Sequence, residues 1–220
     1  MTRMPLQLTL PTPPTWGGRR RGAGRKATPG RRPGVAHRPR PPHHATHPVH
    51  VTLRAVSALR CLRAARVFPA VRRALAAASS RTFQILEFSV QADHVHLVVE
   101  AEAGSALTRG VQGLAIRIAR AINRVLGRRG QVWADRFHAR ALTTPRAVRH
   151  ALVYVLMNFR KHGHGHGIDP CSSGPWFAGW FAPHAAARSG PSPVARARTW
   201  LARVGWRRHG LIALSEKPAG

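Results

Sequence analysis

Two runs decide the fold of this chain: Thr82-Phe-Gln-Ile-Leu-Glu-Phe-Ser-Val90 and His94-Val-His-Leu-Val-Val-Glu100. Both are rich in β-branched and aromatic residues, which are typical of strands. Only the short turn Gln91-Ala92-Asp93 separates them. The two runs therefore predict a β-hairpin.

The sequence before the hairpin predicts one strand and one helix. Val49-His-Val-Thr-Leu-Arg54 alternates and contains many β-formers, which predicts a first strand. Pro69 fits the first turn of a helix, and strong helix formers follow it over residues 70–79.

The sequence after the hairpin predicts a long helix, a strand and a last helix. Apolar residues recur at helical spacing from Leu107 to Val125, with Ser105 as the expected N-cap. Residues 131–142 predict a fourth strand, and Thr144-Pro145 opens a helix that ends near His162. The first six elements match the split βαβ order. We therefore predict an α+β, ferredoxin-like fold: an antiparallel four-stranded sheet with helices on one face.

The charge balance is extreme, with 36 Lys and Arg against 7 Asp and Glu and a net charge of +29. Such a surface attracts polyanions in a salt-dependent way, so nucleic acid is the expected partner. A membrane is not expected, because no run approaches the ~20 apolar residues of a spanning helix and no secretory signal is visible. The two cysteines form no CxxC pair, so a zinc ribbon is not expected. We expect a cytoplasmic, nucleoid-associated protein.

Residues 1–46 are rich in Pro, Gly and Arg and contain no acidic residue. Such a segment cannot bury enough apolar surface to offset its ordering entropy, and it is predicted to be disordered. Two interpretations stay open: a basic arm on DNA phosphates or in a minor groove, and a solvated tail. The candidate DNA contacts are the basic residues of its glycine-flanked clusters: Arg19, Arg20, Arg21, Arg25, Lys26, Arg31 and Arg32.

The remaining chain divides into a predicted catalytic domain, residues 47–164, and a C-terminal extension or subdomain, residues 165–220. The extension is less regular and holds four of the six tryptophans. These aromatic side chains could stack on bases, but packing onto the core is the favoured interpretation.

His94 and His96 are the first candidate site residues. Residues i and i+2 of a strand share a face, so both imidazoles project together while Val95 points into the core. Two imidazoles at this spacing can share a metal ion. An isolated His-x-His triplet in a strand is nevertheless more often incidental.

Tyr154, the only tyrosine of the chain, lies on the last predicted helix with Asn158 four residues later. Both lie about 130° from the middle of the apolar stripe of that helix, and their spacing puts them on one face. A tyrosine placed for core packing should fall on the stripe. A surface tyrosine without function is the competing interpretation.

Together these four residues suit metal-assisted cleavage of a DNA phosphodiester. An ion bound by His94, His96 and the Asn158 carbonyl oxygen could hold and polarise a phosphate. Tyr154 would attack it and form a covalent 5′-phosphotyrosine, which conserves the bond energy for rejoining.

Residues 83–162 resemble the single-tyrosine HUH transposases, specifically the REP-associated tyrosine transposase branch. Three motifs carry the resemblance: Asp93-His-Val-His-Leu-Val-Val99, Val132-Trp-Ala-Asp-Arg-Phe-His-Ala-Arg140 and Tyr154-Val-Leu-Met-Asn158. The strand His47-Pro-Val-His-Val-Thr-Leu-Arg54 and the stretch Trp200-Leu-Ala-Arg-Val-Gly-Trp206 are also similar to that branch.

The resemblance implies a ferredoxin-like catalytic domain that uses Mg²⁺ or Mn²⁺ and cleaves single-stranded DNA beside a palindromic hairpin. It implies that His94 and His96 are the metal pair, Tyr154 the nucleophile and Asn158 the third ligand. Related enzymes often have Gln at this last position and an Asn-Pro pair after the tyrosine, whereas Phe159 follows Asn158 here. Relatives act as monomers or as dimers, and both states stay open.

Arg136 and His138 are further candidate DNA contacts near the predicted fourth strand, although a structural role for His138 is equally plausible. The alternating histidines of residues 162–166 are separated by glycines, which give them no fixed geometry, and we do not predict a metal site there. Two other functions stay open: a non-catalytic nucleic-acid-binding protein and an inactive relic of a mobile element.

Overall fold

The computed structural model describes residues 41–59, 61–163, 167–181 and 190–218. All of them lie in one compact unit that spans residues 35–220. Residues 1–40 of the predicted disordered arm, with its seven candidate DNA contacts, lie outside the described residues. So does most of the histidine-glycine stretch. Residues 41–46, which the prediction also counted as disordered, are described, and His43 Nε2 lies 2.7 Å from the Ala101 carbonyl.

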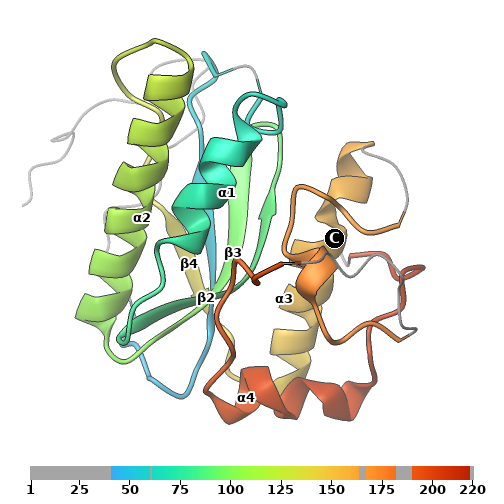
Figure 1. The fold of residues 1–220 in the computed structure, drawn as a ribbon. Coiled ribbons are helices and arrows are strands. Elements are labelled where there is room, and N and C mark those ends of the chain that lie inside the picture. The colour runs from blue at the N-terminus through green and yellow to red at the C-terminus, as the bar shows by residue number, and fades with distance from the viewer. Residues whose placement is uncertain (1–40, 60, 164–166, 182–189, 219–220) are drawn as a thin grey trace, which may run out of the picture. The chain divides into compact units, whose positions relative to one another are not determined.

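The centre of the fold is a four-stranded antiparallel sheet with the strand order β2-β3-β1-β4. The strands are β1 (Val49–Arg54), β2 (Phe83–Val90), β3 (His94–Ala101) and β4 (His138–Ala141). The order and the succession of elements are those of the ferredoxin-like arrangement. The prediction of an α+β fold built on the β2-β3 hairpin is therefore confirmed (Figure 1).

The fourth strand is much shorter than the prediction of residues 131–142. The chain before β4 makes one isolated bridge, between Ala55 and Trp133. The Trp133 indole N–H donates a hydrogen bond to the Ala115 carbonyl in the long helix, at 2.9 Å. The Asp135 carboxylate then accepts a hydrogen bond from the backbone N–H of Arg136. The Ala134 N–H still donates to the Arg54 carbonyl, and the ladder then resumes only at His138.

Two helices, α1 (Phe68–Ala76) and α2 (Gly104–Val125), cover one face of the sheet (Figure 1). Val95, Leu97 and Val99 of β3 are completely buried in the same core cluster as the apolar stripe of α2. The prediction that Ser105 caps α2 was wrong: the N-cap is Ala103. The Ser105 hydroxyl lies in the first turn and accepts a hydrogen bond from the Arg109 guanidinium at 3.5 Å.

The third helix, α3 (Pro145–Met157), packs on the opposite face of the sheet. Its start matches the prediction, because Pro145 occupies the first turn and the Thr144 hydroxyl accepts a hydrogen bond from the Ala147 N–H. The α-helix ends at Met157 and a 3-10 turn, η1 (Asn158–His162), continues it. Val98, which points away from α1 and α2, belongs to the core cluster of α3.

The C-terminal segment closes the free edge of β2. Val90 donates to the Cys171 carbonyl, Ser173 donates to the Phe88 carbonyl, and Ala195 donates to the Ile85 carbonyl. These backbone bonds satisfy groups that an open edge would expose.

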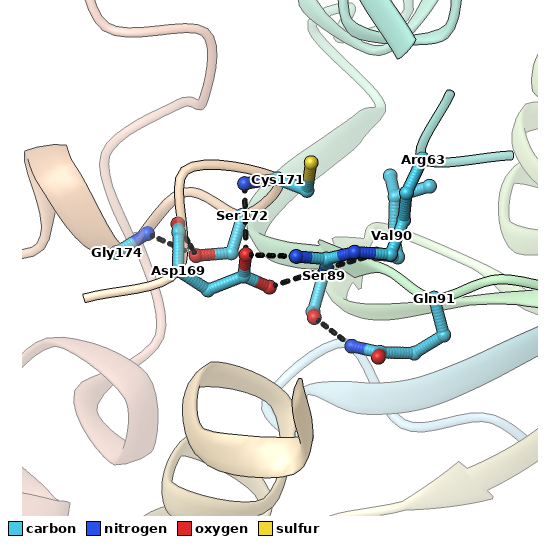
Figure 2. A network of polar contacts seen from close by, with 8 residues as sticks. All are labelled: Arg63, Ser89, Val90, Gln91, Asp169, Cys171, Ser172 and Gly174. Carbon is cyan, nitrogen blue, oxygen red and sulfur yellow. Dashed lines mark hydrogen bonds and ion pairs between the residues drawn. The ribbon is translucent and has the colours of Figure 1, made fainter. Parts of the chain in front are cut away.

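A buried ion pair anchors this segment. The Asp169 carboxylate is fully buried and accepts two hydrogen bonds from the Arg63 guanidinium, at 2.7 and 2.8 Å. Arg63 also donates to the Val90 carbonyl, so one guanidinium joins the C-terminal segment to the end of β2 (Figure 2).

Three short helical turns complete the C-terminal segment: η2 (Gly174–Trp176), α4 (Trp200–Arg203) and η3 (Gly205–His209). Trp206 is buried and stacks on Phe177 with ring centroids 5.7 Å apart. It belongs to the same core cluster as α3. None of the helices in the described residues has the length and apolarity that crossing a bilayer requires.

Candidate active site

The face of the sheet opposite α1 and α2 carries both predicted histidines. His94 and His96 project from the same side of β3, and their ring centroids are 4.6 Å apart. The central strand β1 runs antiparallel beside them, with Thr52 opposite His96. On the other side of β3, Ser89 of β2 is opposite His96 and is fully buried. The two imidazoles are therefore held by a strand that is paired on both sides.

The structure brings Tyr154 and Asn158 to these histidines. The Tyr154 ring centroid is 5.0 Å from that of His96. The Asn158 side-chain nitrogen is 3.5 Å from His94 Nε2, and Asn158 is only 1 % exposed. All four residues that the sequence predicts for the site thus meet at the C-terminal end of α3.

Asp93 orients His94. Its carboxylate Oδ1 is 2.6 Å from His94 Nδ1, so the ring proton belongs on Nδ1 and the Nε2 lone pair faces Asn158. Burial opposes ionisation of Asp93, but the hydrogen bond from His94 and the charges of His94 and Arg54 outweigh it and hold the Asp93 pKa below its usual value. A carboxylate behind an imidazole is the usual way in which proteins orient a metal-binding histidine.

Two side chains of β1 orient His96. Its Nδ1 is 3.1 Å from the Thr52 hydroxyl and 3.3 Å from His50 Nε2. A proton on His96 Nδ1 can be shared with both neighbours only if His50 is neutral with its lone pair on Nε2. Burial, together with the nearby charges of His138 and Arg140, lowers the pKa of His50 to about 4. A proton on His96 Nδ1, shared with Thr52 and a neutral His50, would leave the Nε2 lone pair of His96 for a ligand, as in His94.

His50 is the site residue that the sequence prediction missed. Its ring lies 5.2 Å from His96 and 5.6 Å from Tyr154, between centroids. The available signal was the alternation of His50 and Thr52 on one face of the first strand. That signal becomes informative only when the β1-β3 register is known.

Lys161, in the turn that follows α3, adds a positive charge beside the tyrosine. Its ammonium group lies 5.4 Å from the centre of the Tyr154 ring. A cation at this position is suited to contact a phosphate that approaches the hydroxyl.

The donors present, two borderline imidazole nitrogens and one hard amide oxygen, can bind a divalent cation. Among the described residues, no three His, Cys, Asp or Glu side chains are grouped to hold a metal ion, so the candidate set is two imidazoles and one amide. His94 and His96 have their Nδ1 atoms engaged by Asp93 and by β1, which leaves binding to the Nε2 atoms. The Asn158 amide now presents its nitrogen to His94, and it would have to turn over for its oxygen to become a ligand.

The two other predicted DNA contacts lie near this face. His138 is exposed on β4, opposite Thr52. Its charge helps to lower the pKa of His50. Arg136 is exposed in the bend that precedes β4.

Residues 50–155 match the family model described as IS200-like transposase. This range begins at His50, contains the β2-β3 hairpin and includes Tyr154. This part of the chain is therefore similar to the IS200-like transposases. The shared domain thus contains the whole described site except Asn158 and Lys161, which follow the matched range.

A solved structure of a REP-associated tyrosine transposase bound to a REP hairpin is similar to this chain. The similarity covers 60% of this chain and 76% of that chain, with 18% identity and a TM-score of 0.49. A search of the curated proteins found no match.

Proposed function

We propose that this protein is a metal-dependent single-stranded DNA endonuclease and strand transferase that acts through a covalent 5′-phosphotyrosine. The observation that carries the proposal is the convergence of Tyr154, His96, His94 and Asn158 on one sheet face. The match of residues 50–155 to the IS200-like transposase family model supports DNA breakage and joining as the reaction class.

Tyr154 acts as the nucleophile. Its hydroxyl oxygen attacks the scissile phosphorus, the bond from phosphorus to the 3′ oxygen breaks, and the phenol proton ends on that 3′ oxygen. Attack by the same or another 3′-hydroxyl reverses the step and rejoins a strand. A bound Mg²⁺ or Mn²⁺ would supply polarisation of the phosphate and charge neutralisation.

The supporting residues set up this chemistry. Asp93 and the pair His50 and Thr52 hold the two metal-binding imidazoles in one tautomer and one orientation. Lys161 contacts the phosphate, and α3 fixes the distance between the nucleophile and the sheet. In this chain Tyr154 lies beside its own His96, which supports attack in cis by a monomer or by each subunit of a homodimer.

We infer that the substrate is single-stranded DNA beside a hairpin-forming repeat, and that the protein works on the nucleoid in the cytoplasm. The net charge of +29 supports a polyanionic partner. The motifs around His94, Arg136 and Tyr154 support the REP-associated branch. Exposed His138 and Arg136, and the basic residues of segment 1–46, are the proposed DNA contacts.

The decisive experiment incubates the protein with single-stranded DNA from the flanks of its own gene plus Mn²⁺. A covalent protein–DNA adduct that survives denaturation is expected. Products without an adduct would instead indicate a hydrolytic nuclease with water as the nucleophile. DNA binding with neither product nor adduct would favour a non-catalytic binding protein or an inactive relic.

A further inference from the structure

A buried glutamine, Gln91, lies beside the candidate active site and has no part in the chemistry proposed above. It follows β2 at the hairpin turn, and its backbone N–H donates to the His94 carbonyl at 2.8 Å. Gln91 is therefore the cross-strand neighbour of His94, just as Ser89 is the neighbour of His96. Residues directly opposite each other on antiparallel strands project to the same face, with Cβ atoms about 4.5–5.5 Å apart. The Gln91 side chain thus leaves the sheet on the side of the two imidazoles.

One end of the Gln91 amide is paired and the other end is not. Its nitrogen donates to the Ser89 hydroxyl at 2.6 Å, and its oxygen has no hydrogen-bond partner among the described residues (Figure 2). Both residues are 0 % exposed. A buried acceptor without a donor costs free energy, and an apolar side chain of the same length would fill this position without that cost. The unpaired oxygen therefore points to a donor that reaches it in another state of the site.

The Asn158 amide is such a donor. Asn158 is 1 % exposed, and its nitrogen lies 3.5 Å from His94 Nε2. In the proposed metal-bound site this amide turns over, so that its oxygen faces the ion. The same rotation carries its two N–H donors to the other side, where burial makes them need an acceptor.

Gln91 supplies the acceptor nearest to the site. Three buried side-chain oxygens within the described residues lack a partner: those of Gln84, Gln91 and Asn123. Asn123 belongs to α2, on the other face of the sheet, and Gln84 lies near the opposite end of β2. Only Gln91 is next to His94, and α3, which Asn158 follows, packs against both β2 and β3.

We propose that Gln91 is a positioning residue of the metal site. Its oxygen accepts a hydrogen bond from the Asn158 amide nitrogen and thereby holds the Asn158 oxygen toward the divalent cation. Ser89 holds the other end of the Gln91 amide, so the series from Ser89 through Gln91 to Asn158 determines which atom of each amide faces the ion. The inference rests on the proposed function, because it requires a cation bound by His94 and His96.

The test is a double-mutant cycle that measures Mn²⁺ binding to the protein without DNA, from the loss of the electron paramagnetic resonance signal of free Mn²⁺. Gln91→Met keeps the side-chain length and removes the acceptor. It should weaken Mn²⁺ binding about tenfold, as loss of a partner that supports a metal ligand typically does. In the Asn158→Ala background the same change should have an effect of about twofold or less, because the residue through which Gln91 acts is gone.

Two further measurements separate positioning from a structural role. Gln84→Met is the matched control, because it removes another unpaired buried oxygen seven residues earlier in the chain, and it should leave Mn²⁺ binding unchanged. Urea denaturation without metal should show little loss of stability in Gln91→Met, since the lost bond to Ser89 is offset by removal of an unpaired acceptor.

Three outcomes would overturn the proposal: Gln91→Met binds Mn²⁺ like the wild type, it weakens binding equally with and without Asn158, or it unfolds the protein. Covalent capture of DNA by the wild-type protein is measured in parallel and distinguishes the two proposals. Capture combined with unchanged Mn²⁺ binding in Gln91→Met rejects the positioning role alone. Mn²⁺ binding that depends on Gln91 through Asn158, without capture, rejects the cleavage chemistry alone. A wild-type protein that binds no Mn²⁺ rejects the metal site and the positioning role together.

Discussion

The two faces of the sheet are built for different purposes. The face under α1 and α2 is apolar throughout, and Val95, Leu97 and Val99 of β3 are 0 % exposed there. The other face carries His50 and Thr52 of β1 and His94 and His96 of β3, and α3 covers only part of it. One strand of alternating residues therefore supplies both a core and a reaction site, and each substitution should affect one side only.

The largest effect is expected for Tyr154→Phe. The change removes one oxygen from the functional face, so covalent capture of DNA should be lost completely, because no other tyrosine exists in the chain. Folding and DNA affinity should remain, since the ring contacts to His96 and His50 need no hydroxyl. Adduct formation on denaturing gels and a parallel binding assay measure both. Residual capture by this variant would show that Tyr154 is not the nucleophile.

Substitutions at two neighbouring residues of β3, one facing the site and one facing the core, test the two faces separately. His96→Ala should reduce cleavage by at least about a hundredfold through loss of metal binding, with little loss of stability. Leu97→Ala should lower the free energy of unfolding by about 2–5 kcal/mol, because its side chain fills the core. The folded fraction of Leu97→Ala should cleave normally. Chemical denaturation and single-turnover cleavage compare the two, and equal effects on both quantities would contradict the division of the sheet.

A smaller effect is expected for Asp93→Asn, which weakens the orientation of His94 without removing a proposed ligand. Loss of such a supporting partner typically costs about 10- to 100-fold in metal affinity or activity. The concentration of Mn²⁺ needed for half-maximal cleavage should therefore rise, and excess Mn²⁺ should restore part of the rate. Arg54→Gln is the matched control, since Arg54 contacts only the far side of this exposed carboxylate, at 3.2 Å, and should change little.

The smallest effect concerns stability at acidic pH. Because the pKa of His50 falls from 6.5 to about 4 on folding, the unfolded chain takes up a proton below pH 6.5 that the folded chain does not. Stability should therefore fall as the pH is lowered from about 6.5 to 4, by at most roughly 3 kcal/mol. His50→Gln should flatten this slope in urea denaturation series. Burial raises the pKa of Glu87 to about 8, so Glu87 makes stability change with pH in the opposite direction. Its contribution is the same in both proteins and cancels when their slopes are subtracted. An unchanged slope would show that His50 is protonated in the folded protein.

The order of the elements could be predicted from the sequence because local periodicity reports which face of an element is buried. The hairpin from β2 to β3, the first strand and the start of α3 at Thr144-Pro145 all follow this rule. The fourth strand could not be delimited, because the contact of Trp133 with α2 is a tertiary event that local alternation does not encode. The α2 cap was misplaced for a similar reason: Ser105 favours a cap locally, but the chain enters the helix earlier.

The sequence predicts those parts of the site that lie within one element. His94 and His96 lie on one face of a strand, and Tyr154 and Asn158 are four residues apart on a helix, so each pair could be predicted from its own segment. His50 could not, because its relation to His96 depends on the pairing of β1 with β3 across 46 residues of sequence.

The cover on the β2 edge has a consequence for synthesis of the protein on the ribosome. Val90 finds its backbone partner in Cys171, and Ile85 finds one in Ala195, so these strand groups are translated about 80 to 110 residues before their partners. At 5–20 residues per second, the nascent sheet keeps an uncovered edge for roughly 4 to 20 s. During that time the edge is open to pairing with another nascent chain. Docking of Asp169 against Arg63 covers the Val90 end of the edge, and pairing of Ala195 with Ile85 completes the cover. Slow translation would prolong the time before that pairing.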